Sequence, residues 1–136
     1  MRILFLSPWF SFPHNNGSKL RIFNLLQTLS QQHDIQLITF AETNEDTSGV
    51  HELKKLCGEV EIVEWKAYEP YRAKSVYALL SKEPRSITDT FSSSMKFHIE
   101  ESIKRNSPHL IVASQLRTAT YAPFFHGIPA LFEEVE

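Results

Sequence analysis

Short apolar segments alternate along this chain with longer segments in which apolar residues recur every three or four positions. The longer segments have the period of helices that face a core, whereas the short ones are typical of buried strands. Strands that alternate with helices in this way predict an α/β fold with parallel strands. We expect strands at residues 3–6, 35–40, 60–64, 110–113 and 130–132.

The clearest helix begins near Ser18, which we expect to cap its first turn, and it places Ile22 and Leu26 on one face. A second long helix is predicted over residues 92–105, where apolar residues recur every four positions and an Asn-Ser-Pro sequence follows. Shorter helices are expected at residues 50–57, within 66–90 and at 117–125, and Gly58 is expected to end the first of them.

Right-handed crossovers between these elements give a Rossmann-like open parallel sheet with helices on both faces. The chain has 136 residues, of which 42% are apolar, so we expect residues 1–136 to form one domain around one core. In such sheets, ligands bind beyond the carboxyl ends of the strands, where the strand order switches. The loops after the five strands are therefore the places to search for a site.

Composition excludes several kinds of partner. The 14 Lys and Arg residues against 16 Asp and Glu give a formal net charge of −2, so nucleic-acid binding is not expected. No window approaches the ~18 apolar residues of a membrane span, and the run at residues 3–6 is too short for a secretory signal. A lone cysteine, Cys57, favours a reducing, cytoplasmic location. The histidines are scattered without metal-ligand spacing, so neither a metal nor a cofactor is expected.

The loop after the first strand is the most informative segment, because it exceeds the usual βα turn of about 2–6 residues. Asn16 and Gly17 form a turn dipeptide before a helix whose free N–H groups, with Ser18 at its start, could face an anion. Arg21 could then contact a phosphate or carboxylate in a bidentate manner. A plain turn with a solvated Arg21 is the alternative. His14 is the only histidine in a predicted site loop.

Later loops add further candidates. Ser114 and Gln115 follow the fourth strand, and Glu133 follows the fifth, where a carboxylate could act as a base or bind sugar hydroxyls. The acidic residues at this position could equally be a solvated end. The first loop carries aromatic side chains that either form the floor of a sugar or lipid site or simply pack: Trp9, Phe10 and Phe12.

Familiar catalytic and nucleotide motifs are missing. The chain has no G-x-G-x-x-G turn, no P-loop and no G-x-S-x-G elbow. A phospho-receiver domain would need acidic residues at the ends of the first and third strands, where Ser7 and Trp65 stand. The sequence therefore identifies no catalytic residue.

Several segments together resemble the N-terminal half of family 4 glycosyltransferases, which have the GT-B fold: residues 3–8, Pro13, 16–18, Arg21 and 33–40, with a weaker likeness at 108–115. The resemblance implies transfer of a sugar from a nucleotide-sugar donor, with retention of anomeric configuration and without a metal. It also implies that Gly17 lies near the donor diphosphate, where backbone N–H groups would stabilise the leaving charge.

Members of that family have two Rossmann-like domains, of which the N-terminal one mostly binds the acceptor and the C-terminal one the nucleotide sugar. The resemblance implies that this chain is the acceptor-side domain and lacks the donor domain. Two positions depart from the pattern. Many members have two adjacent glycines where this chain has Gly17 and Ser18, and a histidine often follows the later strand, where Ser114 and Gln115 stand.

We therefore expect the N-terminal part of a retaining glycosyltransferase that is folded but has little or no activity alone. Its acceptor would be a sugar or a lipid-linked molecule, and the latter would bring this cytoplasmic protein into peripheral contact with the inner face of the membrane. One alternative is a stand-alone flavodoxin-like module that binds a ligand or a protein without catalysis. Another is a different GT-B enzyme, such as a sugar epimerase.

Overall fold

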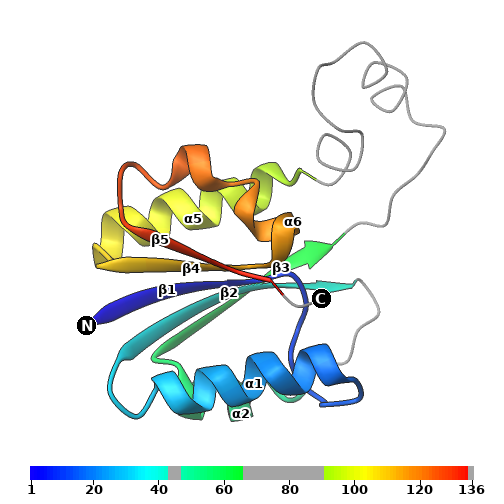
Figure 1. Ribbon diagram of the computed structural model, residues 1–136. Coiled ribbons are helices and arrows are strands. Elements are labelled where there is room, and N and C mark those ends of the chain that lie inside the picture. The colour runs from blue at the N-terminus through cyan, green and yellow to red at the C-terminus, as the bar shows by residue number, and fades with distance from the viewer. Residues whose placement is uncertain (43–46, 66–90, 135–136) are drawn as a thin grey trace, which may run out of the picture.

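The computed structural model describes residues 1–42, 47–65 and 91–134 (Figure 1). The helix expected within residues 66–90 lies outside these ranges. The elements, in chain order, are β1 (Arg2–Ser7), α1 (Gly17–Leu29), β2 (Asp34–Glu42), α2 (Val50–Leu56), β3 (Glu59–Trp65), α5 (Ser93–Asn106), β4 (Leu110–Ser114), α6 (Gln115–Ala119), the 3-10 helix η2 (Ala122–Phe124) and β5 (Ala130–Glu133).

The five strands form one parallel sheet in the order β3-β2-β1-β4-β5. Helices α1 and α2 cover one face, and α5 and α6 cover the other (Figure 1). The chain moves outward from β1 to β3 in one direction and then returns to place β4 on the other side of β1. This arrangement confirms the predicted α/β, Rossmann-like sheet and puts the switch in strand order between β1 and β4.

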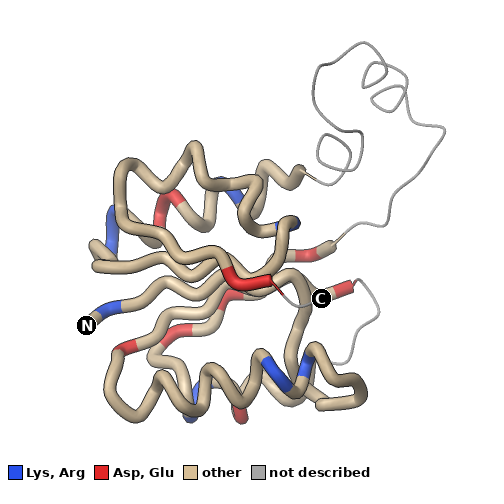
Figure 2. The backbone as a smooth tube through the Cα atoms, in the orientation of Figure 1, with Lys and Arg blue, Asp and Glu red and all other residues tan. Residues whose placement is uncertain are grey.

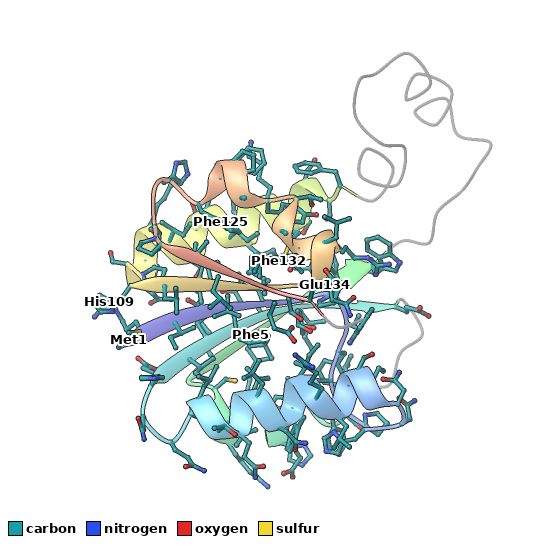
Figure 3. All side chains as sticks on the ribbon, viewed as in Figure 1. Met1, Phe5, His109, Phe125, Phe132 and Glu134 are labelled. Carbon is teal, nitrogen blue, oxygen red and sulfur yellow. The ribbon has the colours of Figure 1, made fainter. Side chains whose placement is uncertain are left out.

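The sheet buries apolar side chains on both faces, as a parallel sheet between two helical layers requires. Phe5 of β1 is fully buried against the α1 layer, while its neighbour Leu4 is fully buried on the α5 side. Figure 3 shows Phe5 on the α1 side of the sheet and Phe125 within the opposite layer. Alternation along β1 therefore supplies both halves of the core.

Helix α1 begins two residues earlier than a Ser18 cap implies and has a different cap. Asn16, not Ser18, is the N-cap: its backbone is extended, with φ −149° and ψ 164°, and its side-chain oxygen accepts from the backbone N–H of Lys19 at 2.8 Å. Asn and Ser are equally good N-caps, so the residue type alone does not decide between Asn16 and Ser18. The cap is Asn16 because the extended backbone of the loop ends there, and Gly17 is the first helical residue.

Two other helix ends differ from expectation. Gly58 does not terminate α2, because Cys57 is already extended at φ −112° and Gly58 donates its N–H to Ile35 of β2. The helix predicted at residues 117–125 is instead α6 followed by η2. The ring of Pro123 would clash with the carbonyl of Ala119 in a continuous α-helix, and this explains the break.

A polar network joins the last half of α5 to β2 and β3. Its members are Gln36, Glu59, Glu61, His98, Ser102, Arg105 and Asn106. Gln36 lies at its centre: its Oε1 accepts from Ser102 at 2.5 Å and from Asn106 at 2.8 Å, and its Nε2 donates to Glu59 at 2.8 Å. Hydrogen bonds therefore replace apolar packing at this end of the α5 layer.

Replacing Gln36 with Leu should lower the free energy of unfolding by about 1–3 kcal/mol, because the buried Ser102 hydroxyl loses its acceptor and Glu59 loses a donor. Urea denaturation followed by circular dichroism measures the change. Gln27→Leu, on the exposed surface of α1, is the matched control and should shift the curve much less. Equal shifts in the two variants would contradict a structural role for the network.

The reactivity of Cys57 provides a separate test of how α2 packs on the sheet. Its side chain is buried, and desolvation raises the pKa of the thiol to about 12. The reactive thiolate is therefore almost absent at pH 8. We expect a disulfide reagent to leave Cys57 unmodified in the native protein and to titrate one thiol in urea. Rapid native modification would show that α2 does not close over this face.

Candidate functional site

Loops and helix ends that follow the strands meet at the carboxyl edge of the sheet. Figure 3 shows Glu134 at this edge, while Met1 and His109 mark the opposite, amino edge. Basic positions on α1 and α6 and acidic positions on neighbouring strands come together here (Figure 2). The edge predicted to hold the site therefore gathers charges of both signs.

Glu133, at the end of β5, is held by two partners from other elements. Arg21 of α1 places both Nε and Nη2 at 2.8 Å from Glu133 Oε1, and Ser114 of β4 donates to Oε2 at 2.7 Å. The Glu133 side chain is only 11% exposed, against 54% for Arg21. The interpretation of Glu133 as part of a solvated end is wrong, and Arg21 is not a freely solvated cation.

This arrangement changes what the three residues can do. Ser114 is fully buried, and its hydroxyl donates to Glu133, so its role is to hold the carboxylate in place. Each carboxylate oxygen of Glu133 already accepts a hydrogen bond, and its negative charge faces Arg21. Glu133 therefore acts first as a bridge between α1 and the end of the sheet.

The start of α1 leaves backbone donors exposed. Among the described residues, nothing accepts from the N–H groups of Gly17 and Ser18, which lie at the positive end of the helix. Gly17 has no left-handed backbone, and a Cβ placed there would meet nothing within 4 Å. The glycine is therefore not required by the turn, and its site is open to a ligand.

The structure gives His14 a packing role. Its ring lies between Phe12 and Phe23, with centroids 5.1 and 4.1 Å away, and its Nδ1 is 3.1 Å from the carbonyl oxygen of Ser11. His14 does not line the cavity described next.

A cavity of about 410 Å³ opens at the carboxyl ends of β1, β2 and β3. The first loop, the start of α1, the ends of β2 and β3, and α6 each contribute to its wall. Its lining residues are Pro8, Trp9, Asn15, Asn16, Lys19, Phe40, Ala41, Glu42, Trp65 and Arg117. Of the residues singled out from the sequence, Asn16 and Trp9 line it.

Arg117 and Trp65 are among the cavity residues that were not singled out from the sequence. The guanidinium carbon of Arg117 lies 4.0 Å from the centroid of the Trp65 ring, a cation–π contact. Burial lowers the pKa of Arg117, and the nearby charge of Glu42 partly opposes that effect. Trp65 is the last residue of β3 and Arg117 lies in α6, at the strand ends where the site was expected, but neither belongs to a motif that would identify it.

Gln115 joins β4 directly to α6 and has φ 64°, a left-handed conformation that is strained for a residue other than glycine. This sharp turn starts α6 immediately after Ser114 and brings Arg117 back over the carboxyl edge toward Trp65. Gln115 is therefore one residue that shapes the cavity wall without lining it.

Within residues 1–42, 47–65 and 91–134, no three side chains of His, Cys, Asp or Glu gather as metal ligands would. None of the helices in these ranges has the length and apolar character needed to cross a bilayer. No protein-family model matches the chain, and no curated protein matches it.

The Glu133 bridge can be tested by its effect on stability. Glu133→Gln keeps an acceptor for Ser114 but removes the charge that faces Arg21, so we expect a loss of about 1–3 kcal/mol in the free energy of unfolding. Glu134→Gln, which changes an exposed neighbour in the same way, should be nearly neutral. A cycle with Arg21→Gln isolates the pair, and additive losses would argue against coupling.

Proposed function

We propose that this chain is the acceptor-side domain of a retaining glycosyltransferase of the GT-B type. The observation that carries the proposal is the cavity of about 410 Å³ at the carboxyl edge, with Trp9 and Trp65 in its wall and the start of α1 beside it. Ligand sites in parallel α/β sheets occupy this edge. The resemblance of residues 3–8, 16–18 and 33–40 to family 4 supplies the reaction.

The cavity wall has the mixture of surfaces that a sugar needs. A sugar ring presents a C–H face, which packs on aromatic rings, and a rim of hydroxyls, which need donors and acceptors. Trp9 supplies an aromatic surface, and the Asn15, Asn16 and Glu42 side chains supply polar groups in the same wall. An acceptor hydroxyl held there would lie close to the start of α1.

The donor diphosphate would then lie near Gly17. The exposed N–H groups of Gly17 and Ser18 and the positive end of α1 would stabilise charge on the departing diphosphate. In the transfer step, the acceptor oxygen bonds to the anomeric carbon as the bond from that carbon to the diphosphate oxygen breaks. The acceptor hydroxyl passes its proton to the departing diphosphate oxygen in the same step, so the step needs neither a protein base nor a metal.

Glu133 is better suited to positioning than to accepting that proton. Arg21 and Ser114 already donate hydrogen bonds to its two oxygens. It would hold α1, and with it Gly17, at a constant distance from the ends of β4 and β5.

A second Rossmann-like domain would carry the nucleotide sugar and close the cleft. Leu131 and Phe132 on the edge strand β5 are each 51% exposed, and further polypeptide would cover them in such an arrangement. We further propose a cytoplasmic protein whose acceptor is a sugar or a lipid-linked molecule. A lipid-linked acceptor would place the domain at the inner face of the membrane.

Tryptophan fluorescence provides the test, because the chain has two tryptophans and both line the cavity. Titration with neutral mono- and oligosaccharides should give a saturable change in emission. Trp9→Leu, with Trp65 left as the reporter, should weaken sugar binding at least tenfold, because the aromatic surface is lost. Phe97→Leu, which alters an exposed aromatic residue on α5, is the control and should leave the affinity unchanged.

Transfer of a labelled sugar from nucleotide-sugar donors is measured on the same protein. Sugar binding without transfer is the expected result, since the donor-side wall is on another domain. Robust turnover by this chain would contradict that division, and the absence of any sugar-dependent change in emission would contradict an acceptor site. Binding of non-sugar ligands alone would favour a flavodoxin-like binding module.

A further inference from the structure

Arg117 differs from the other arginines in the described part of the chain. Arg2 donates to the carbonyl of Ser107, Arg21 pairs with Glu133, and Arg105 contacts Glu59 and Glu61. Arg117 has no described carboxylate within 4.0 Å and no described hydrogen-bond acceptor; its contact is the Trp65 ring. It is also half-buried and lines the cavity.

Stacking on a ring leaves the guanidinium able to bind a ligand. The contact with Trp65 uses one face of the planar group, while the five N–H donors lie in its plane and point outward. Donors held away from bulk water are costly when they lack acceptors. The planar edge matches two oxygens of a phosphate or carboxylate, which would form short, charge-assisted hydrogen bonds.

Other charges around the cavity restrict what the ligand can be. The first turn of α1 contributes Lys19 and the positive end of the helix, and both favour an anion. Glu42 lines the same cavity, and its carboxylate would repel a small anion that carries no hydroxyl groups. A ligand that also carries hydroxyls can donate one of them to the Glu42 carboxylate while its anionic group reaches Arg117.

We propose that this cavity binds a hydroxyl-rich molecule that carries a phosphate group, with the phosphate on the Arg117 guanidinium and a hydroxyl directed to Glu42. The sugar-like part of this ligand rests on the proposed function, whereas the phosphate contact rests on Arg117 alone. Free sugar phosphates and the polyol phosphate headgroups of lipids share this chemistry.

Binding of glucose 6-phosphate, glucose and inorganic phosphate is compared by tryptophan emission and by calorimetry. Glucose 6-phosphate should bind at least tenfold more tightly than glucose, in line with a charge-assisted pair. Arg117→Gln should reduce that preference to about twofold or less, and Arg117→Lys should retain part of it because the charge remains without the planar fork. Lys104→Gln, which removes an exposed charge on α5, is the matched control and should keep the full preference. Circular dichroism of each variant confirms that it is folded.

A second arm distinguishes the two sources of the phosphate. Vesicles of phosphatidylglycerol, which has a polyol headgroup, are compared with phosphatidylcholine vesicles in sedimentation assays. Binding to the former that depends on Arg117, at a higher affinity than for glucose 6-phosphate, identifies a lipid headgroup as the source. Tighter binding of glucose 6-phosphate identifies a soluble one.

Several outcomes would overturn the proposal. Equal affinities for glucose and glucose 6-phosphate, an unchanged preference in Arg117→Gln, or no binding of any phosphate probe would each do so. In the first two cases binding of glucose leaves the sugar-acceptor function standing. If phosphate probes bind through Arg117 and neutral sugars do not bind at all, the phosphate site stands and the proposed function fails.

Discussion

Strand β1 pairs with β2 along one side and with β4 along the other, and its side chains are buried on both faces of the sheet. Phe5 packs toward α1 while Leu4 and Leu6 pack toward α5, so each helical layer depends on the same six-residue strand. The two halves of the sheet run outward from β1 in opposite directions. The loop that leaves its carboxyl end therefore emerges where the strand order switches, which is the position of the candidate site.

At that edge, different kinds of contact hold the wall of the site. The Glu133 carboxylate is largely removed from solvent and is compensated by Arg21 and Ser114, which tie α1 to β4 and β5. Such a pair costs desolvation and gains attraction, so its main consequence is to fix relative positions. Arg117 is compensated differently, by the π face of Trp65, and its donors remain available. The first arrangement is complete within the domain, whereas the second leaves hydrogen-bonding capacity for a ligand.

The polar network around Gln36 lies at the end of α5 toward the amino edge, and each of its residues has a hydrogen-bond or ion-pair partner within it. Its residues fasten the helix to β2 and β3 without lining the candidate cavity. The two ends of the α5 layer therefore have different roles. At the amino edge, the hydrogen bonds around Gln36 stabilise the fold. At the carboxyl edge, the strained turn at Gln115 and the contact of Arg117 with Trp65 shape the cavity.

Periodicity along the sequence determined the five strands, the long helices α1 and α5, and the parallel α/β class, because these depend on local alternation between buried and exposed positions. It also directed attention to the loops after the strands. The tertiary structure alone decided that Asn16 caps α1, that Glu133 is paired with Arg21 and largely shielded from solvent, and that Arg117 stacks on Trp65. The Asn16 cap is a local contact, whereas the contacts of Glu133 and Arg117 join segments far apart in the chain. They follow from strand order and from the sharp turn into α6, and neither has a local signature in the sequence.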